Sequence, residues 1–428
     1  MTKYDLIDCI NECMVGQYLS NIDKLNSLLI SKQISNQICK KLIFNEKIRY
    51  LDIPVQKYNQ VRSIYSFYLT TDRLHSHTLP KSLTSLSFHN DCEFECECSQ
   101  LIAPHILPQS LKKLTFGHCI DKPIAEYVIP QSLESLVFSS NYNQTIAPNV
   151  LPTGLTSLIF GSNYNQPILS QILPQSLENL TFGFFFDHLI QPYVLPSNIT
   201  SLTFGYLFNQ LIIPHVLPQK LQFLVFDYCF NQLITPNVFP SGLQSLTFGD
   251  EFNQLITPNV FSSGLQSLTF GRMFNQPMTM GVLPIGLTCL IFGDKFDKVI
   301  SPNILPKTLV SLTFGPSFNQ VMTMGVLPDG LKNLTFGACF NSAISIGVLP
   351  QSLENLTFGF FFNHKLSSKV LPDGLKSLTL GGFFNQLIEH ESLPTSLINL
   401  NLSHRFKKTN LPKILPLSLK ITYIVKNN

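Results

Sequence analysis

Three cysteines and a histidine lie close together in the segment 89–98, and thiolate and imidazole groups are the usual ligands of zinc. The segment holds His89, Cys92, Cys96 and Cys98 together with four carboxylates. Its spacing, Cys-x3-Cys-x-Cys, matches no common zinc module. Two interpretations follow, a metal site and an exposed acidic loop. We expect the loop, and we expect no metal or cofactor.

Motifs of the common catalytic sites are absent from the sequence. It contains no glycine-rich phosphate loop, no His-Glu-x-x-His, no nucleophile elbow and no kinase signature. The ten histidines lie mostly at variable positions of the repeat described below, as His188 and His215 do, which is typical of surface residues. We therefore expect that the protein is not an enzyme.

Charged residues are scarce, at 13% of the 428 residues, against about 25% in a typical soluble protein. The net charge is +3 and the basic residues are scattered, so nucleic acid is not expected as a partner. No run approaches about 18 apolar residues, which argues against a membrane span. Charges at Lys3, Asp5, Asp8 and Glu12 would interrupt a secretory signal, and ten cysteines are sparse, so we predict a cytoplasmic protein.

A 22-residue repeat organises most of the chain. The pair Leu-Pro, or a close variant, recurs in fourteen successive steps of 22 residues with no insertion. The pairs begin at Leu107, Ile129, Leu151, Leu173, Leu195, Leu217, Phe239, Phe261, Leu283, Leu305, Leu327, Leu349, Leu371, Leu393 and Leu415. An earlier copy starts at Leu79 and holds six extra residues around Cys92 to Cys98. Because one such unit cannot bury its apolar face alone, the period predicts a solenoid of stacked coils.

Each coil contains one short segment with the alternation of a β-strand. In the coil that begins at Leu195, Leu202 and Phe204 are predicted to point inward and Thr203 outward. Gly205 follows, and glycine fills this position in eleven of fourteen full coils. The glycine predicts a turn with positive φ, which a residue without a side chain adopts freely.

An asparagine follows the second phenylalanine of most coils. The asparagines are Asn143, Asn165, Asn209, Asn231, Asn253, Asn275, Asn319, Asn341, Asn363 and Asn385. Such a column predicts a ladder of side-chain amides that satisfies buried backbone groups between coils. Asp121, Asp187 and Asp297 replace the asparagine in three coils, and we interpret them as structural substitutes and not as catalytic acids.

The pattern resembles that of a known repeat family. Leu-x-x-Leu-x-Phe looks like the strand half of a leucine-rich repeat, and the Leu-Pro start with a later Phe-Asn-Gln-x-Ile, as at Phe252 to Ile256, resembles the FNIP repeat. The resemblance covers residues 79–428 and implies a leucine-rich-repeat-like solenoid, mainly β with short parallel strands, of about fifteen 22-residue coils.

Residues 1–78 form a separate N-terminal region with apolar residues at helical spacing, which predicts a small α-helical region. FNIP-repeat proteins are often paired with an F-box, and the segment 18–32 resembles the middle of one, with Ser20 as N-cap. The residues expected to contact a ubiquitin-ligase adaptor are Leu19, Ile22, Leu25 and Leu28. The Leu-Pro-x-Glu opening of an F-box is absent, so a degenerate F-box and a plain helical cap for the solenoid both stay open.

The two positions after each glycine vary most in chemistry from coil to coil, so a partner that distinguishes coils would contact them. Aromatic side chains near a surface are common anchors at protein interfaces. The aromatic candidates at these positions are Phe184, Phe185, Tyr206, Tyr228, Phe360 and Phe361. The alternative is that these positions are solvent loops under little constraint.

Together these features favour a non-enzymatic scaffold for protein–protein interaction. Its sharper form is a substrate receptor of a cullin-type ubiquitin ligase, in which residues 1–78 bind the adaptor and the solenoid captures a target. The alternative is a structural or partner-binding solenoid with no ubiquitin link. A metal-sensing or enzymatic protein built around the cysteine loop is a third and weaker possibility.

Overall fold

The computed structural model describes residues 79, 81–88, 102–117 and 120–424, together with the backbone of residues 43–44 and 63–67. The chain forms two compact units, Met1–Gly205 and Tyr206–Asn428. The cysteine segment 89–98 and the N-terminal helices predicted around Leu19 to Leu28 lie outside the described residues. The boundary predicted at residue 79 stays a prediction.

Each coil contributes one short strand, as the alternation predicts. The strands of the first unit are β1 (Ile43–Phe44), β2 (Ser63–Phe67), β3 (Ser85–Phe88), β4 (Lys113–Thr115), β5 (Ser135–Val137), β6 (Ser157–Ile159), β7 (Asn179–Thr181) and β8 (Ser201–Thr203). Those of the second are β9 (Phe223–Val225), β10 (Ser245–Thr247), β11 (Ser267–Thr269), β12 (Cys289–Ile291), β13 (Ser311–Thr313), β14 (Asn333–Thr335), β15 (Asn355–Thr357), β16 (Ser377–Thr379), β17 (Asn399–Ser403) and β18 (Lys420–Ile424). Two 3-10 helices, η4 (His390–Ser392) and η5 (Lys408–Asn410), occur near the end of the second unit.

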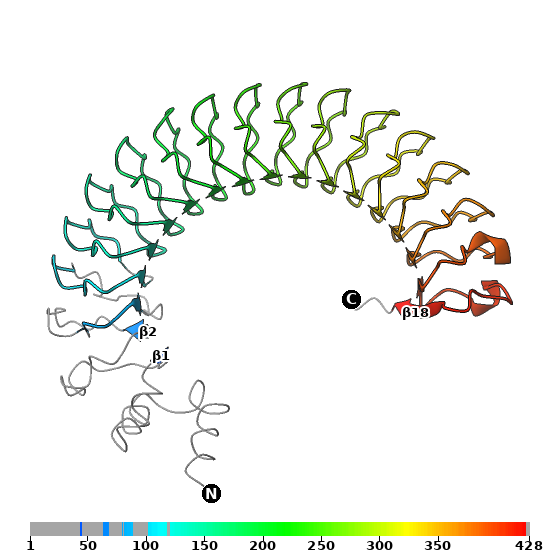
Figure 1. Cartoon of the computed structure of the whole chain (residues 1–428), viewed down its shortest axis with the longest axis horizontal. Coiled ribbons are helices and arrows are strands. Elements are labelled where there is room, and N and C mark those ends of the chain that lie inside the picture. The colour runs from blue at the N-terminus through cyan, green and yellow to red at the C-terminus, as the bar shows by residue number, and fades with distance from the viewer. Residues whose placement is uncertain are drawn as a thin grey trace, which may run out of the picture. The chain divides into compact units, whose positions relative to one another are not determined.

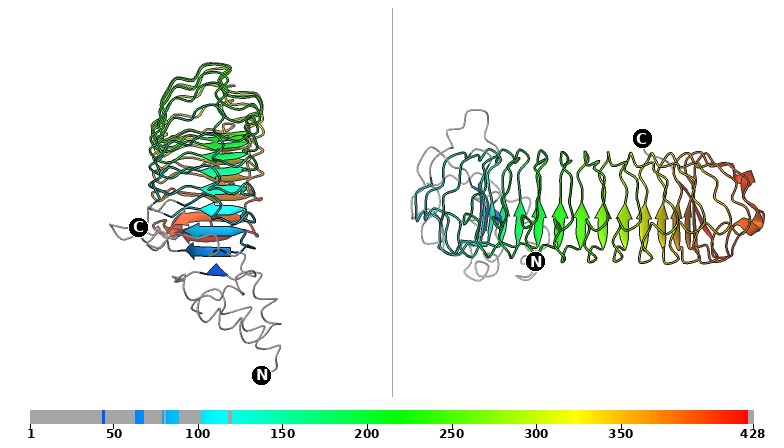
Figure 2. Two further views of the ribbon diagram at one scale, coloured as in Figure 1. Left: turned by 90° about the vertical axis from the view of Figure 1, so that its left-hand side faces the viewer. Right: turned by 90° about the horizontal axis from the view of Figure 1, so that it is seen from above.

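Within each unit, consecutive strands pair in parallel and in the register of the repeat. Ser245 of β10 lies opposite Ser267 of β11, 22 residues later, and the pairs after it keep the same offset. The longer first copy does not disturb this register, because β3 still pairs with β4, with Ser85 opposite Lys113. In each unit the strands line the inner side of the curve, side by side (Figures 1 and 2).

Columns of apolar side chains fill the inside of the coils. Leu202 and Phe204 are fully buried, whereas Thr203 between them is half-buried, so the predicted strand orientation is confirmed. The phenylalanine rings stack from coil to coil, with centroids 5.7 Å apart for Phe248 and Phe270 and 6.0 Å apart for Phe252 and Phe274. Each coil therefore completes its core only against its neighbours, as expected for a solenoid.

The glycine at the end of each strand serves a purpose different from the predicted one. No positive φ is found at this position in the described residues; instead, where glycine stands there, the backbones of consecutive coils approach too closely for a side chain, whereas three coils accommodate Ser139, Asp227 or Ser403. A Cβ atom built on Gly271 would overlap the carbonyl oxygen of Gly249 in the preceding coil, and Gly293 stands in the same relation to Gly271. The prediction of a positive-φ turn at Gly205 and its equivalents is thus wrong, and close coil packing is the physical reason for the glycine.

Positive φ occurs instead two residues before the Leu-Pro pair, once in each coil from His105 to Lys369. The residues are His105, Tyr127, Asn149, Gln171, Tyr193, His215, Asn237, Asn259, Gly281, Asn303, Gly325, Gly347 and Lys369. Seven of the thirteen are asparagine or glycine, the residues that tolerate this region best. The enrichment of asparagine and glycine at this position could have predicted the positive-φ turn before each Leu-Pro pair.

The asparagine ladder is present and joins each coil to the next. The Oδ1 atom of Asn253 accepts a hydrogen bond from the backbone N–H of Asn275 at 2.9 Å and another from Nε2 of Gln276 at 3.1 Å. Asp297 accepts the equivalent bonds from Asn319 and Gln320, both at 2.9 Å. Asp121 does the same for Asn143 and Gln144. The interpretation of these acids as structural substitutes is therefore confirmed for Asp121 and Asp297.

We expect Gly271→Ala to destabilise the second unit strongly, because its methyl group would overlap backbone that can move only by separating two coils. The expected loss of unfolding free energy is about 3 kcal/mol or more, measured by urea denaturation. Gly242→Ala is the matched control: its Cβ would lie 3.4 Å from the nearest atom, the Gln219 oxygen. Its effect should stay within about 1 kcal/mol. Equal losses in the two variants would contradict the packing argument.

We expect Asn253→Ala to cost about 1–3 kcal/mol, because the N–H of Asn275 and the amide of Gln276 lose their acceptor. Asn253→Asp keeps the acceptor in the manner of Asp297 and should cost clearly less. Thermal unfolding followed by circular dichroism compares the two variants. If Asn253→Asp lowers the stability as much as Asn253→Ala does, the hydrogen bonds that the side-chain oxygen accepts are not what stabilises the ladder.

Candidate functional site

The two residues that follow the glycine position, here called the turn pair, are held between neighbouring coils by their own backbone ladder. The second residue of most pairs donates its N–H to the carbonyl oxygen of the first residue in the preceding coil, whereas the N–H of Arg405 donates to Oγ of Ser403 at 3.3 Å. Cys229 donates to Tyr206 at 2.9 Å, Glu251 to Tyr228 at 2.8 Å and Phe383 to Phe360 at 2.9 Å. The side chains of the turn pairs therefore project from a fixed backbone.

An aromatic cluster, formed by Phe360, Phe361 and Phe383, occupies two consecutive turn pairs of the second unit. The rings of Phe361 and Phe383 stack with centroids 5.4 Å apart and planes at 15°. Phe360 meets them edge-on, at 5.2 Å from Phe361 and 5.0 Å from Phe383. Phe361 and Phe383 keep 46% and 47% of their surface exposed, which leaves apolar area available for a partner.

Gly382 makes room for this cluster. A Cβ atom at this position would overlap the ring of Phe360, which lies over the glycine backbone. Phe360 is consequently half-buried, whereas Phe361 is exposed. Sequence reasoning identified Phe360 and Phe361 but missed Phe383 and Gly382, although both lie 22 residues after them and the period could have found them.

The first unit carries an aromatic turn pair at the same position of its coil. Phe184 and Phe185 are 41% and 43% exposed, and their rings meet edge-on with centroids 4.9 Å apart. The N–H of Phe185 donates to the carbonyl oxygen of Ser162 at 2.9 Å. Both phenylalanines predicted as surface anchors are therefore on the surface.

Tyr206 and Tyr228 occupy consecutive turn pairs at the start of the second unit and stack face to face, with centroids 4.6 Å apart. The hydroxyl of Tyr228 accepts a hydrogen bond from Nη2 of Arg272 at 3.3 Å. A hydrogen bond with Glu251 raises the pKa of Tyr228 above its usual value, and Arg272 acts in the opposite direction. These tyrosines belong to a polar network, which sequence reasoning did not foresee because Arg272 lies 44 residues from Tyr228.

The strand face beside the turn pairs has little charge. Its outward side chains are mostly half-buried serine, asparagine and threonine, as Ser311 and Thr313 are. Just before the strands, Glu354 pairs with Lys376 at 2.6 Å and with Lys332 at 3.4 Å. The hydrogen bond from Lys376 is the main reason that the pKa of Glu354 is lowered. Such exposed pairs add little stability.

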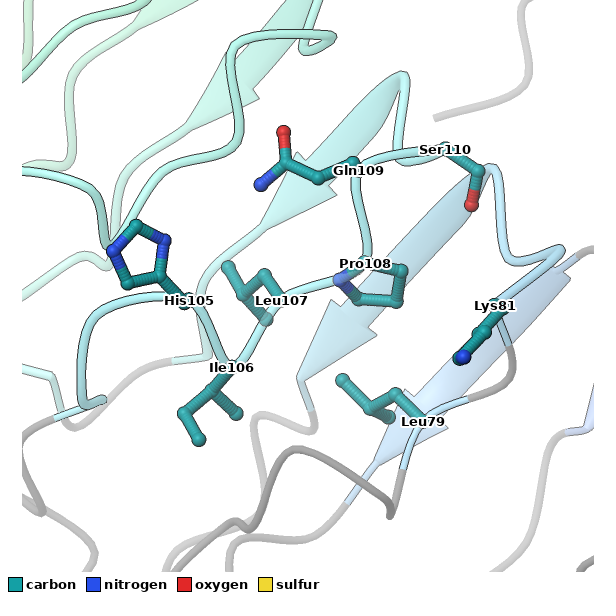
Figure 3. A pocket seen from close by; sticks show the side chains of 8 residues that line it. All are labelled: Leu79, Lys81, His105, Ile106, Leu107, Pro108, Gln109 and Ser110. Carbon is teal, nitrogen blue, oxygen red and sulfur yellow. The ribbon is translucent and has the colours of Figure 1, made fainter.

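A hollow of about 350 Å³ lies between the first described coils. Figure 3 shows its lining by Leu79, Lys81 and the segment from His105 to Ser110. Besides apolar groups, the lining holds the ammonium of Lys81, the imidazole of His105, the amide of Gln109 and the hydroxyl of Ser110, and it contains no carboxylate. It adds no candidate for chemistry to the turn pairs.

The described part of the chain brings together no group of three or more His, Cys, Asp and Glu side chains that could hold a metal ion. Its helices are too short and polar for any of them to cross a bilayer. Cys289 and Cys339 are free thiols.

The FNIP repeat model matches the chain in nine segments that together cover residues 72–424. The segments are 72–119, 99–141, 142–185, 186–229, 230–273, 274–317, 318–361, 362–404 and 384–424. No curated protein matches the chain.

Solved structures share its repeat architecture. The crystal structure of CroV588, described as a novel circular LRR protein, is 44% identical over 85% of this chain and 52% of that one, with a TM-score of 0.78. A TLR13–ssRNA13 complex is 15% identical over 83% of this chain and 59% of that one, with a TM-score of 0.56, a likeness of fold alone. The chain thus spans about half the length of CroV588.

Proposed function

This chain belongs to the FNIP repeat family, and we propose that it is a non-enzymatic scaffold that binds other proteins through its turn pairs. A repeat solenoid that resembles leucine-rich-repeat proteins is consistent with such a role. The proposal is more specific than the fold, because it names the surface that makes the contact.

The exposed aromatic cluster of Phe360, Phe361 and Phe383 carries the proposal. Water-exposed phenylalanine is unfavourable by roughly 25 cal/mol per Å² of apolar surface, so covering it by a partner is favourable. The cluster needs little ordering on binding, since the backbone ladder and ring contacts already fix it. Large aromatic side chains held in place are typical anchors of protein interfaces.

The test is affinity purification of the full chain, followed by mass spectrometry, beside the double variant Phe361→Ser, Phe383→Ser. Proteins that bind through the cluster should be depleted at least tenfold with the variant. Leu233→Ser is the control: Leu233 is 50% exposed but lies outside the turn pairs. If both variants retain the same proteins as the unmodified chain, the turn-pair surface is not the binding site.

The finer proposal is that the protein is a substrate receptor of a cullin-type ubiquitin ligase in the cytoplasm. Its support is the sequence of residues 18–32, which resembles the middle of an F-box and places Leu19, Ile22, Leu25 and Leu28 at helical spacing. In this scheme residues 1–78 bind the ligase adaptor while the turn pairs hold the target. The alternative is a partner-binding or structural solenoid with no ubiquitin link.

Leu25→Asp with Leu28→Asp should abolish co-purification of the adaptor and cullin with the full chain, because two charges would enter an apolar contact face. A point variant suits this test better than deletion of residues 1–78, since β2 pairs with β3 and its removal would expose a sheet edge. Asn26→Asp with Ser27→Asp adds the same charge beside the apolar positions and serves as the control. Absence of adaptor and cullin from the unmodified chain would leave the solenoid without a ubiquitin link.

A further inference from the structure

The aromatic cluster of the second unit lies next to cations. Phe361, Phe383 and Arg405 occupy the same position in three successive coils, so the guanidinium-bearing residue follows the two exposed rings along one column. The strands before these positions pair in register, with Ser377 of β16 opposite Asn399 of β17. In the order of the coils, the positive side chain therefore comes directly after the two exposed rings.

The coil that carries Arg405 is fixed on the coil that carries Phe383. The ring of Phe406 stacks on Phe384 with centroids 6.0 Å apart, and the N–H of Lys407 donates to Oδ1 of Asn385 at 3.0 Å. The side chains of Arg405 and Lys407 are exposed. Within the coils that the structure describes, neither forms an ion pair.

Acidic side chains are missing from the whole end of the chain. From Ser392 to Asn428 the sequence holds no Asp or Glu, but it holds six Lys and Arg residues. On the other side of the cluster, the preceding turn pairs are uncharged: they are Ala338 with Cys339 and Pro316 with Ser317. Among the turn pairs next to the cluster, positive charge therefore stands on one flank only.

The aromatic pair of the first unit lacks this arrangement. Phe184 and Phe185 follow a coil whose turn pair is Ser162 and Asn163, and an acid, Asp187, lies two residues after Phe185. The exposed fractions of the aromatic side chains are nearly equal at the two sites, but only the site in the second unit has a cation in a neighbouring turn pair. Aromatic exposure and flanking charge can therefore be tested separately.

We propose that Phe361, Phe383, Arg405 and Lys407 bind an acidic peptide segment of a partner protein, one in which bulky apolar side chains stand directly beside carboxylates. This inference rests on the proposed function and names the chemistry of its partner. The apolar side chains cover the two rings, and the carboxylates pair with the guanidinium of Arg405 in the bidentate geometry that arginine favours. Lys407, two residues after Arg405 in the same coil, supplies a second exposed charge.

A single-stranded nucleic acid is the other ligand class that combines stacking with charge, and the surface fits it less well. Each nucleotide carries a phosphate, so its binding sites place cations along the whole track of the strand. Here the turn pairs of the two coils before Phe361 are uncharged. A short acidic peptide matches two rings with cations at one end.

The experiment uses the full chain and a fluorescein-labelled peptide of twelve residues with two Leu-Phe pairs, each flanked by Asp and Glu. Binding is measured by fluorescence anisotropy at low and at physiological salt. The unmodified chain should bind this peptide at least tenfold more tightly than a version with Lys in place of the acids, and raising the salt should weaken binding. Arg405→Glu with Lys407→Glu should reduce affinity at least tenfold, as should Phe361→Ser with Phe383→Ser.

The control is Leu233→Ser with Leu255→Ser, which removes two apolar side chains that are each 50% exposed but lie outside the turn pairs, and it should leave affinity within about twofold. Circular dichroism spectra confirm that each variant is folded. Equal binding of the acidic and basic peptides, or a loss for the control variant as large as that for Phe361→Ser with Phe383→Ser, would overturn the proposal. Tighter binding of labelled oligo-dT than of the acidic peptide would replace it with a nucleic-acid site.

The result also separates this inference from the proposed function. If the cluster variant loses partners in affinity purification while the acidic peptide does not bind, the scaffold role stands and the inferred partner chemistry is wrong. If neither partners nor peptide depend on the cluster, both proposals fail.

Discussion

Close backbone contact between consecutive coils is the constraint on which the rest of each unit depends. Where a glycine ends a strand, its coil approaches the carbonyl of the coil before it so closely that a side chain would not fit. This holds the coils one strand spacing apart in strict register. At that spacing phenylalanine rings stack, asparagine side chains reach the next backbone N–H, and the turn pairs form their own ladder. Each of these contacts needs the same offset of 22 residues.

Most of the fold follows from the sequence because the repeat samples one local structure many times. The alternation around Leu202, Thr203 and Phe204 was sufficient to assign the inward and outward faces. The asparagine column likewise predicted side-chain bonds between coils, since a polar residue recurring in register has an identical neighbour to bond with. The periodic pattern alone was therefore sufficient to predict which residues of neighbouring coils contact one another in the core.

The sequence did not predict the role of the strand-end glycine or the side-chain contacts at the candidate site. Glycine has more than one use, and the sequence does not distinguish positive φ from close approach; only the distance between coils decides it. The real positive-φ position is filled by residues as different as Tyr127, Asn303 and Lys369, so no single residue type marked it. At the candidate site, Tyr228 and Arg272 meet across two coils and Phe360 rests on Gly382, contacts that arise only after stacking.

The same regularity restricts where specificity can reside. Side chains that build the core and the ladders must repeat in every coil, so they carry no information that differs along the solenoid. The strand face is also nearly uniform, because serine, asparagine and threonine recur there. What changes from coil to coil is the turn pair, from Asp250 and Glu251 to Phe360 and Phe361. Phenylalanine rings that a fixed backbone holds exposed to water are unfavourable in free energy, and a partner that covers them would explain their presence.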